Sequence, residues 1–315
     1  MGKKKSLLKT SLFTVGLLEV VNRIIDSASI ANTNTKTGGS YYHWKHGDIY
    51  YRTFGEKDYP PMLLIHDLTV WSSEYEWLKM AKVLSDTYRI YCVDLIGCGK
   101  SDKPGITYTN YFYVQMITDF VKEVIKAPTL VAATGLSGSF VLMANALDET
   151  LFTEIMLVSP ESLTTLKKSP DEYSKLWLKL FEIPVIGRSV YYFLTNRSNT
   201  EYYLTEKCFL NSFHMEPSIT RTYYNAAHAR NGNGKYLLAS LNSNYLYADI
   251  SKALQKTTKR VVMAFGEGDP DAKSTLEQYL RLNPDIVVEY IEGAKHLPQL
   301  EDESYEEMLE LMYHF

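Results

Sequence analysis

Short apolar runs alternate with amphipathic stretches along most of the chain. Six runs rich in valine, isoleucine and leucine have the length of buried strands, and turn-forming residues bound most of them. Between most of these runs the residue pattern is that of helices, and strands that alternate with helices indicate a mostly parallel sheet. The predicted strands cover residues 62–66, 89–94, 129–134, 154–159, 260–265 and 286–291, and predicted helices include 74–84, 111–125 and 274–282.

Two segments depart from this alternation. Residues 41–54 have the pattern of an opening hairpin that turns at 45–48. Residues 161–247 contain helical patterns without a strand and are dense in tyrosine, which predicts a helical insert. We therefore expect four units: an N-terminal amphipathic segment and linker (1–39), the first part of the core (40–160), the insert (161–247) and the second part of the core (248–315).

A serine, an acid and a histidine follow three of the predicted strands in that order. The pentapeptide Gly135-Leu136-Ser137-Gly138-Ser139 lies between the strand 129–134 and an apolar stretch typical of a buried helix. A serine on such a strand-to-helix turn has an accessible hydroxyl, and the N–H of Gly138 is placed to hold an oxyanion. The last position of this motif is usually glycine, and Ser139 is small enough to fit there.

The predicted acid and histidine complete a nucleophilic triad. Asp269 and His296 each lie in a loop directly after a predicted strand. In this hypothesis Ser137 attacks, His296 takes its proton as general base, and Asp269 fixes the imidazole tautomer. Glu161, which follows the strand 154–159, is the alternative acid, and we favour Asp269.

Two further segments carry a resemblance to a known family. Residues 61–68 (PMLLIHDL) and 94–104 (DLIGCGKSDKP), taken with the serine motif, resemble the α/β-hydrolase superfamily, in its capped serine hydrolase form, over about 41–315. The resemblance implies an α/β-hydrolase fold: a mostly parallel eight-stranded sheet with helices on both faces. It also implies that the insert 161–247 is a cap over the active site. We expect most tyrosines of this insert to pack the cap onto the core and some of them to line an apolar substrate pocket.

The resemblance assigns roles to the loop after the first parallel strand as well. It implies that Leu68 and Gly138 give the two oxyanion N–H donors, and that His66 and Asp67 support this loop. Asp67 stands where the family usually has glycine. A carboxylate that points into the oxyanion hole opposes the developing negative charge. We therefore expect Asp67 to point away or to accept hydrogen bonds from nearby loop N–H groups.

The leading functional hypothesis is a serine hydrolase that cleaves a carboxylic ester of small or medium size and apolar character, with no cofactor and no metal. An amidase or peptidase, or a carbon–carbon hydrolase, would use the same residues and stays open. A non-catalytic ligand receptor on the same scaffold also stays open, because Asp67 and Ser139 depart from the family pattern.

Composition narrows the partners and the compartment. The 315 residues are 45% hydrophobic and carry a net charge of −4, so no basic surface indicates nucleic acid. Three scattered cysteines give no disulfide framework, which favours a reducing, cytoplasmic location. At the N-terminus three lysines precede an apolar stretch broken by charges, too short for a membrane span. An amphipathic helix with peripheral membrane contact through residues 3–25 is our expectation, and a signal or anchor is the alternative.

Overall fold

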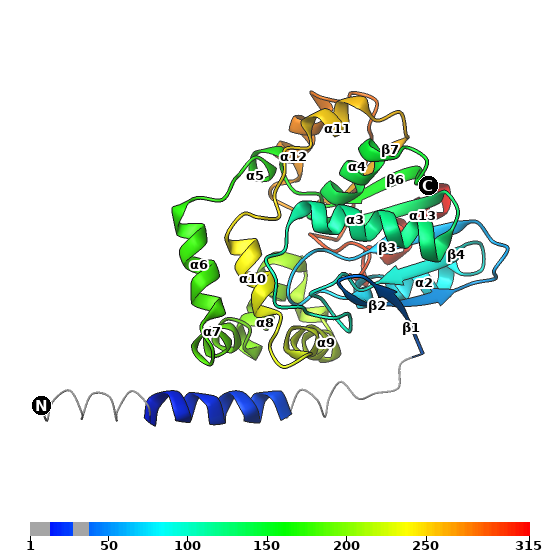
Figure 1. Ribbon diagram of the computed structural model, residues 1–315. Coiled ribbons are helices and arrows are strands. Elements are labelled where there is room, and N and C mark those ends of the chain that lie inside the picture. Colours follow the sequence, from blue (N-terminus) through cyan, green and yellow to red (C-terminus); the bar gives the residue numbers. More distant parts are fainter. Residues whose placement is uncertain (1–12, 28–37) are drawn as a thin grey trace, which may run out of the picture.

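One mixed sheet organises the computed structural model, which describes residues 13–27 and 38–315. The strand order is β1-β2-β4-β3-β5-β6-β7-β8 (Figure 1). β2 runs antiparallel to β1 and β4, and the remaining neighbours are parallel, as predicted. The strands are β1 (Ser40–Trp44), β2 (Gly47–Phe54), β3 (Pro61–Ile65), β4 (Arg89–Val93), β5 (Thr129–Thr134), β6 (Phe152–Val158), β7 (Val261–Gly266) and β8 (Val287–Ile291).

Alternate residues of the central strands enter two different hydrophobic clusters, because successive side chains of a strand point to opposite faces. On one face Leu63 and Val131 pack in a cluster that includes residues of the helices α3 (Asn110–Phe120) and α4 (Ser137–Leu147). On the other face Leu64 and Ala132 pack in a cluster with residues of the helices α2 (Leu78–Leu84) and α13 (Tyr305–His314). The sheet is therefore covered on both sides, which explains why its strands read as unbroken apolar runs in the sequence.

The core helices follow the predicted pattern with small shifts at their ends. The prediction 74–84 corresponds to the short 3-10 turn η1 and α2, and 111–125 to α3 and its π-helical continuation η2. These core elements are η1 (Glu74–Trp77), α2 (Leu78–Leu84), α3 (Asn110–Phe120), η2 (Val121–Ile125), α4 (Ser137–Leu147), α11 (Ser251–Lys256), α12 (Ala272–Leu280) and α13 (Tyr305–His314).

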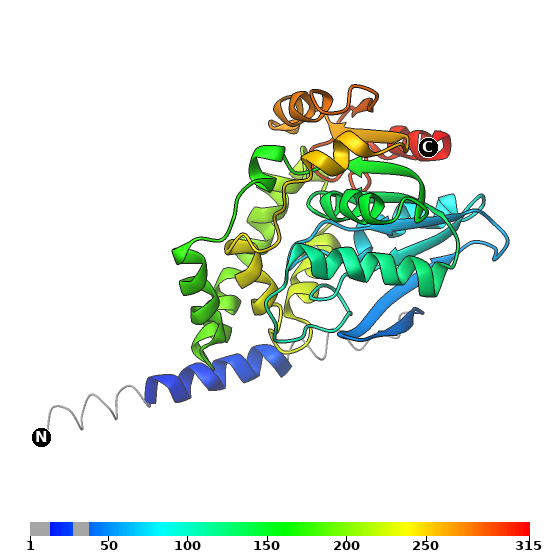
Figure 2. The same cartoon turned by 45° about the horizontal axis from the view of Figure 1, so that its top comes forward.

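Between β6 and β7 the chain forms a group of helices at one side of the sheet (Figures 1 and 2). They are α5 (Leu163–Leu166), α6 (Glu172–Glu182), α7 (Ile186–Leu194), α8 (Arg197–Tyr203), η3 (Leu204–Cys208), η4 (Ser212–His214), α9 (Pro217–His228) and α10 (Lys235–Asn242).

Residues 13–27 are helical and lie against α7 (Figures 1 and 2). Among the described residues, no helix has the length and apolarity needed to cross a membrane.

Candidate active site

The turn between β5 and α4 is formed by Gly135, not by the serine that follows it. Gly135 has φ +56°, the left-handed conformation that glycine adopts without steric cost. Ser137 is already the first residue of α4 and is fully buried. Its hydroxyl donates a hydrogen bond to the backbone oxygen of His66 at 2.7 Å. The structure therefore places the predicted nucleophile inside the helix, two residues beyond the turn.

The carboxylate of Asp67 lies over this turn and accepts hydrogen bonds from two backbone N–H groups, one in its own loop and one in the turn. Oδ1 accepts the backbone N–H of Leu68 at 2.7 Å and that of Leu136 at 3.0 Å. Oδ2 lies 3.1 Å from Nε2 of His296. We expected Asp67 to point away or to accept loop N–H bonds; it accepts the loop N–H of Leu68 and also points inward.

Two predicted contacts are absent from the described part of the chain. No hydrogen bond joins Ser137 to His296 there, because Asp67 stands beside the imidazole instead. The N–H of Gly138, predicted as an oxyanion donor, is directed to the backbone oxygen of Gly135 at 3.3 Å. The pair of N–H groups that face one anionic oxygen belongs to Leu68 and Leu136.

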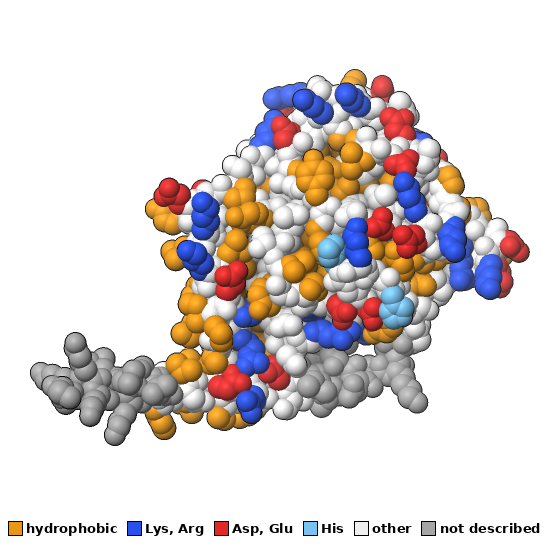
Figure 3. Space-filling view, viewed as in Figure 1, with side chains coloured by type: hydrophobic (Ala, Val, Ile, Leu, Met, Phe, Trp, Pro, Cys, Tyr) orange, Lys and Arg blue, Asp and Glu red, His pale blue; other side chains and the backbone are white. Residues whose placement is uncertain are grey.

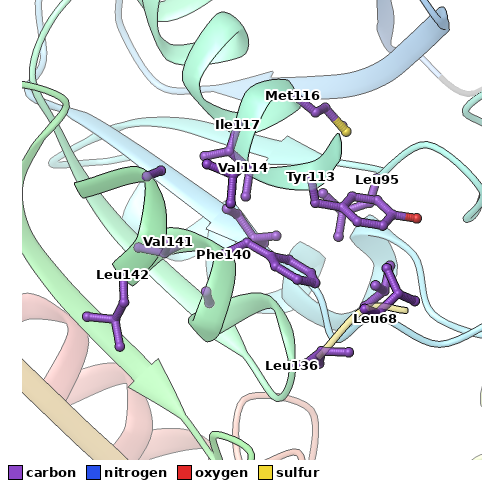
Figure 4. Close-up of a cluster of buried hydrophobic side chains, with 14 of the residues drawn as sticks. Leu68, Leu95, Tyr113, Val114, Met116, Ile117, Leu136, Phe140, Val141 and Leu142 are labelled. Atoms are coloured by element: carbon purple, nitrogen blue, oxygen red, sulfur yellow. The ribbon is translucent and has the colours of Figure 1, made fainter. Parts of the chain in front are cut away.

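The hydrophobic core fixes this pair of donors. The side chains of Leu68 and Leu136 are both buried and belong to the larger core cluster, where Figure 4 shows them close to each other at one end. A Cβ added at Gly135 would overlap the carboxylate of Asp67. The carboxylate therefore fills the space in which a side chain at position 135 would begin.

Buried hydrogen bonds hold the loop that carries Asp67. Nε2 of His66 accepts the N–H of Leu95 at 3.0 Å, so its proton lies on Nδ1, which donates to the backbone oxygen of Asp67 at 2.6 Å. Burial lowers the pKa of His66, in keeping with this neutral tautomer. Oε2 of the buried Glu76 accepts the N–H of Asp67 at 2.9 Å. Buried hydrogen bonds thus hold both His66 and Asp67 in this loop, and Glu76 is a further partner that the sequence did not indicate.

The surroundings of His296 favour its charged form. Burial alone would lower its pKa, but the hydrogen bond with Asp67 and the negative charges around the ring raise it to about 9. Those charges belong to Asp67, Asp269 and Glu161. Within the described residues neither Asp269 nor Glu161 hydrogen-bonds to His296, so the choice between these two acids stays a prediction.

A cavity of about 640 Å³ opens over these groups. Asp67, His296, Asp269 and Glu161 all line it, and Ser137 does not. Its wall is rich in hydroxyl and charged side chains, among them Ser162, Thr164, Thr165, Lys207, Ser274, Thr275 and Lys295, and it includes the amide of Gln278.

One wall residue of the cavity has an unsatisfied hydroxyl. The buried Ser159, directly after β6, has φ +43° and its hydroxyl has no hydrogen-bond partner among the described residues. A buried polar atom without a partner costs free energy, so a bound ligand or water is the natural partner here. The predicted apolar pocket lined by tyrosines differs from this wall, to which the cap contributes Tyr203.

The position of the β5–α4 turn could have been predicted from the glycine that follows the strand. The apolar strand ends at Thr134, and the next residue is the one that must take an unusual backbone conformation. Glycine is the residue best suited to that conformation, and only Gly135 directly follows the strand. The serine of the motif, Ser137, lies two residues further along the chain.

A model of the alpha/beta hydrolase family matches residues 62–310, and the chain belongs to this family. A curated relative, the 2-hydroxy-6-oxo-6-(2'-aminophenyl)hexa-2,4-dienoic acid hydrolase of Metapseudomonas resinovorans, is 27% identical over 105 residues. That match covers 33% of this chain and 36% of the relative, so it spans about a third of the relative's length.

Solved structures share the fold over most of the chain. A serine hydrolase involved in carbazole degradation has a TM-score of 0.71 at 17% identity, over 88% of this chain and 97% of that one. The carboxylesterase CesB of Bacillus subtilis has a TM-score of 0.66 at 19% identity, over 94% and 98%. An enol-lactonase of Burkholderia xenovorans has a TM-score of 0.67 at 16% identity, over 87% and 98%. At these identities the likeness concerns the fold alone.

Proposed function

We propose that the protein is a hydrolase in which His296 moves protons to and from a small or medium-sized substrate bound in the 640 Å³ cavity. The observation that carries the proposal is the contact between His296 Nε2 and Asp67 Oδ2 on the cavity wall. A histidine within reach of both a substrate cavity and a fixed carboxylate is suited to general acid–base catalysis. Membership of a hydrolase family supports the reaction class.

The charge state of His296 determines its first role. With a pKa raised to about 9, the imidazole carries its proton at neutral pH and can donate it to a leaving group. After His296 has given its proton to the leaving group, its neutral imidazole can accept a proton from water. The same residue can thus serve as acid and then as base.

The nature of the cavity wall favours a polar substrate. Hydroxyl and charged side chains outnumber apolar ones there, and the hydroxyl of Ser159 lacks a partner. We therefore propose a substrate with hydrogen-bonding groups near the bond that is cleaved, in place of the apolar ester predicted from the tyrosine content. The curated relative is named for hydrolysis of a substituted dienoic acid, a substrate with polar groups of this kind.

Ester hydrolysis through Ser137 remains the prediction from the sequence. It requires the Ser137 hydroxyl to leave the oxygen of His66, and the carboxylate of Asp67 to leave the two N–H donors that an oxyanion needs. We therefore base the proposal on His296, which lines the cavity.

Hydrolysis of a substrate panel tests the proposal. The panel comprises p-nitrophenyl esters of rising chain length, the matched amides and aryl epoxides, with wild type compared with His296→Gln. We expect turnover of at least one class to fall by about a hundredfold or more in His296→Gln. His43→Gln, at an exposed histidine of β1, is the matched control and should retain full activity.

Two results would count against a hydrolase. One is more than a tenth of wild-type turnover in His296→Gln. The other is no turnover of any class by folded wild type, which would favour the non-catalytic receptor.

A further inference from the structure

We propose that Asp67 is the covalent nucleophile of this site, a carboxylate supplied by the loop after β3 in place of a side chain at the β5–α4 turn. This deepens the proposed function, on which it rests, by naming the group that attacks. The substrate class that follows is one with an electrophilic saturated carbon bearing a leaving group.

The geometry around Gly135 carries the first step of the argument. The β5–α4 turn presents no side chain to the cavity, because position 135 is glycine. The carboxylate of Asp67 occupies the volume where that side chain would start, as the overlap with an added Cβ shows. Asp67, not Ser137, is the group at this turn that also lines the cavity.

The two carboxylate oxygens have different surroundings, which is the second step. Oδ1 is held by the N–H groups of Leu68 and Leu136, so it is fixed in place. Oδ2 meets only the protonated His296 among the described residues, and this contact lies at the cavity. The arrangement leaves Oδ2 as the attacking atom and directs it towards a substrate beside His296.

The N–H groups of Leu68 and Leu136 are already hydrogen-bonded, which excludes attack on an acyl substrate by another residue. An acyl substrate attacked by another group needs an empty pair of donors for its oxyanion, and Asp67 Oδ1 occupies this one. Displacement at a saturated carbon develops no carbonyl oxyanion on the substrate, so the occupied donors are no obstacle.

The atoms and electrons of the reaction balance. Oδ2 attacks the carbon, a carbon–oxygen ester bond forms, and the leaving group departs with the bonding electrons and takes the proton of His296. Neutral His296 then removes a proton from water, whose oxygen attacks Cγ of Asp67. The oxyanion that forms on Oδ1 is stabilised by Leu68 and Leu136. Collapse releases the alcohol with the proton of the new hydroxyl, and both the carboxylate and the imidazolium are restored.

Esterification by a carboxylate-directed epoxide tests the proposal. The full-length protein is treated with 1,2-epoxy-3-(4-nitrophenoxy)propane and the adduct is located by peptide mapping. We expect Asp67 to be labelled at least about tenfold faster than the exposed Asp58, because its oxygen is oriented and desolvated. His296→Gln should prolong the adduct, Asp67→Asn should abolish it, and Ser137→Ala should keep it.

Turnover in ¹⁸O-water gives a second readout. Hydrolysis at Cγ should leave one ¹⁸O atom in the peptide that contains Asp67. Labelling of Ser137, labelling of Asp67 no faster than Asp58, or turnover of the epoxide without ¹⁸O in Asp67 would overturn the proposal. Labelling of Asp67 needs no natural substrate, so it tests the nucleophile separately from the substrate panel. If Asp67 is labelled but no substrate of the panel is turned over, only the proposed hydrolysis of those substrates is overturned.

A second inference rests on a different observation, the orientation of the helix at residues 13–27. Two of its polar residues face the protein: Asn22 and Asp26 are buried, and Asn22 donates to the backbone oxygen of Val185 at 3.2 Å. Arg188 of α7 pairs with Asp26 at 3.1 Å and also with Glu19. The helix is therefore attached to the cap by hydrogen bonds and ion pairs.

The opposite side of this helix is apolar and exposed. Phe13, Leu17, Val20 and Ile24 recur at spacings of four, three and four residues, which places them on one face, and each is more than half exposed. The neighbouring helices α6 and α7 also have exposed apolar residues, including Leu176 and Phe193. Figure 3 shows hydrophobic side chains gathered over this side of the molecule, next to the helix at 13–27. An amphipathic helix that turns its apolar side to solvent needs another apolar environment.

We propose that this face binds the surface of an anionic membrane. The lysines at positions 3–5 precede the helix in the sequence and provide the positive charge that such a surface attracts. The helix lies flat in the interface in this proposal, and the cap side of the cavity faces the lipid.

Vesicle flotation tests this inference with the full chain. Vesicles of phosphatidylcholine with phosphatidylserine should bind wild type, and the double substitution Leu17→Gln with Ile24→Gln should reduce binding by about tenfold or more. Leu147→Gln, at an exposed leucine of α4, is the matched control and should bind like wild type. No binding by wild type, or a dimer that the double substitution converts to monomer, would overturn the proposal.

Discussion

Asp67 and His296 form an ion pair on the wall of the cavity. Two backbone N–H groups hold Oδ1 of the carboxylate in place, and Oδ2 lies 3.1 Å from Nε2 of the imidazole. Burial lowers the pKa of His296, but the hydrogen bond with Asp67 and the surrounding negative charges outweigh burial and raise this pKa to about 9. The charge of His296 should therefore depend on Asp67.

The first prediction concerns this titration. We expect the His296 ring to titrate near pH 9 in wild type and at least about one unit lower in Asp67→Asn. In the folded protein the pKa of His296 lies above the ordinary value of 6.5. The contribution of its ion pair to the free energy of unfolding is therefore fully present below about pH 6.5 and is lost as the pH rises through about 9. NMR of the imidazole protons from pH 5 to 10 measures it, and an equal pKa in both proteins would contradict the ion pair.

The second prediction concerns Glu76. Burial, followed by the nearby charge of Asp67, raises its pKa to about 8 from the ordinary 4.5. The folded protein therefore keeps a proton that the unfolded chain has lost between these values, and stability falls as the pH rises from about 4.5 to 8. Glu76→Gln should remove this fall and raise the free energy of unfolding at pH 8 by about 1 kcal/mol or more.

Denaturant unfolding of wild type and Glu76→Gln at pH 5 and pH 8 measures the effect. Glu149→Gln, at an exposed acid, is the control and should follow wild type at both values. A Glu76→Gln protein that loses as much stability as wild type between pH 5 and 8 would show that Glu76 is ionised throughout.

The sequence identified Asp67, His296, Asp269 and Glu161 as residues of one site, and the structure places all four around one cavity. It did not predict that Asp67 meets His296, because that contact depends on how closely two loops approach after folding. Ser137 was selected because it matches a motif, although its backbone position lies within a helix.

At the scale of elements, the β5–α4 turn determines what the site can do. The strand delivers the chain to the cavity, Gly135 reverses it, and α4 begins two residues later. The positive φ at position 135 and the neighbouring carboxylate leave no room for a side chain.

The third prediction is that Gly135→Ala destabilises the protein by about 1–3 kcal/mol, because it strains the backbone and displaces Asp67 from its N–H donors. The pKa of His296 should fall at the same time, since its partner moves. Thermal or denaturant unfolding and the His296 titration measure both effects. Gly38→Ala, where an added Cβ meets no atom, is the control. An unchanged pKa would mean that the carboxylate tolerates a side chain here.

The strands were predictable because buried parallel strands read as continuous apolar runs, and each predicted run overlaps an observed strand. The predicted opening hairpin is also present, as β1 and β2. Helix ends were less accurate: α12 begins at Ala272, two residues before the prediction, because Pro270 and Asp271 start the helix from the loop.

At the scale of the whole molecule, aromatic contacts connect the helices between β6 and β7 to the core. Tyr203 of α8 stacks on Trp71 with ring centroids 4.7 Å apart, and Tyr223 of α9 donates a hydrogen bond to Glu76 at 3.3 Å. Of these two tyrosines, only Tyr203 lines the cavity. The composition predicted that aromatic residues connect cap and core, but not which of them reach the substrate.

The fourth prediction is that Tyr203→Ala raises KM with little change in the labelling rate of Asp67, because it removes cavity wall without touching the reacting atoms. Tyr202→Ala, at the exposed neighbouring tyrosine, is the matched control and should leave KM unchanged. Steady-state kinetics with the best substrate of the panel measures it. Loss of Asp67 labelling in a folded Tyr203→Ala protein would show that the cap positions the carboxylate.

Reaction with a fluorophosphonate tests the central claim most directly, because this reagent marks a serine that stands beside free oxyanion donors. We predict no adduct at Ser137 in folded wild type. The double substitution Asp67→Gly with Gly135→Ser frees the N–H groups of Leu68 and Leu136 and places a hydroxyl at the turn, so it should gain an adduct at position 135. An adduct on Ser137 in wild type would contradict the account.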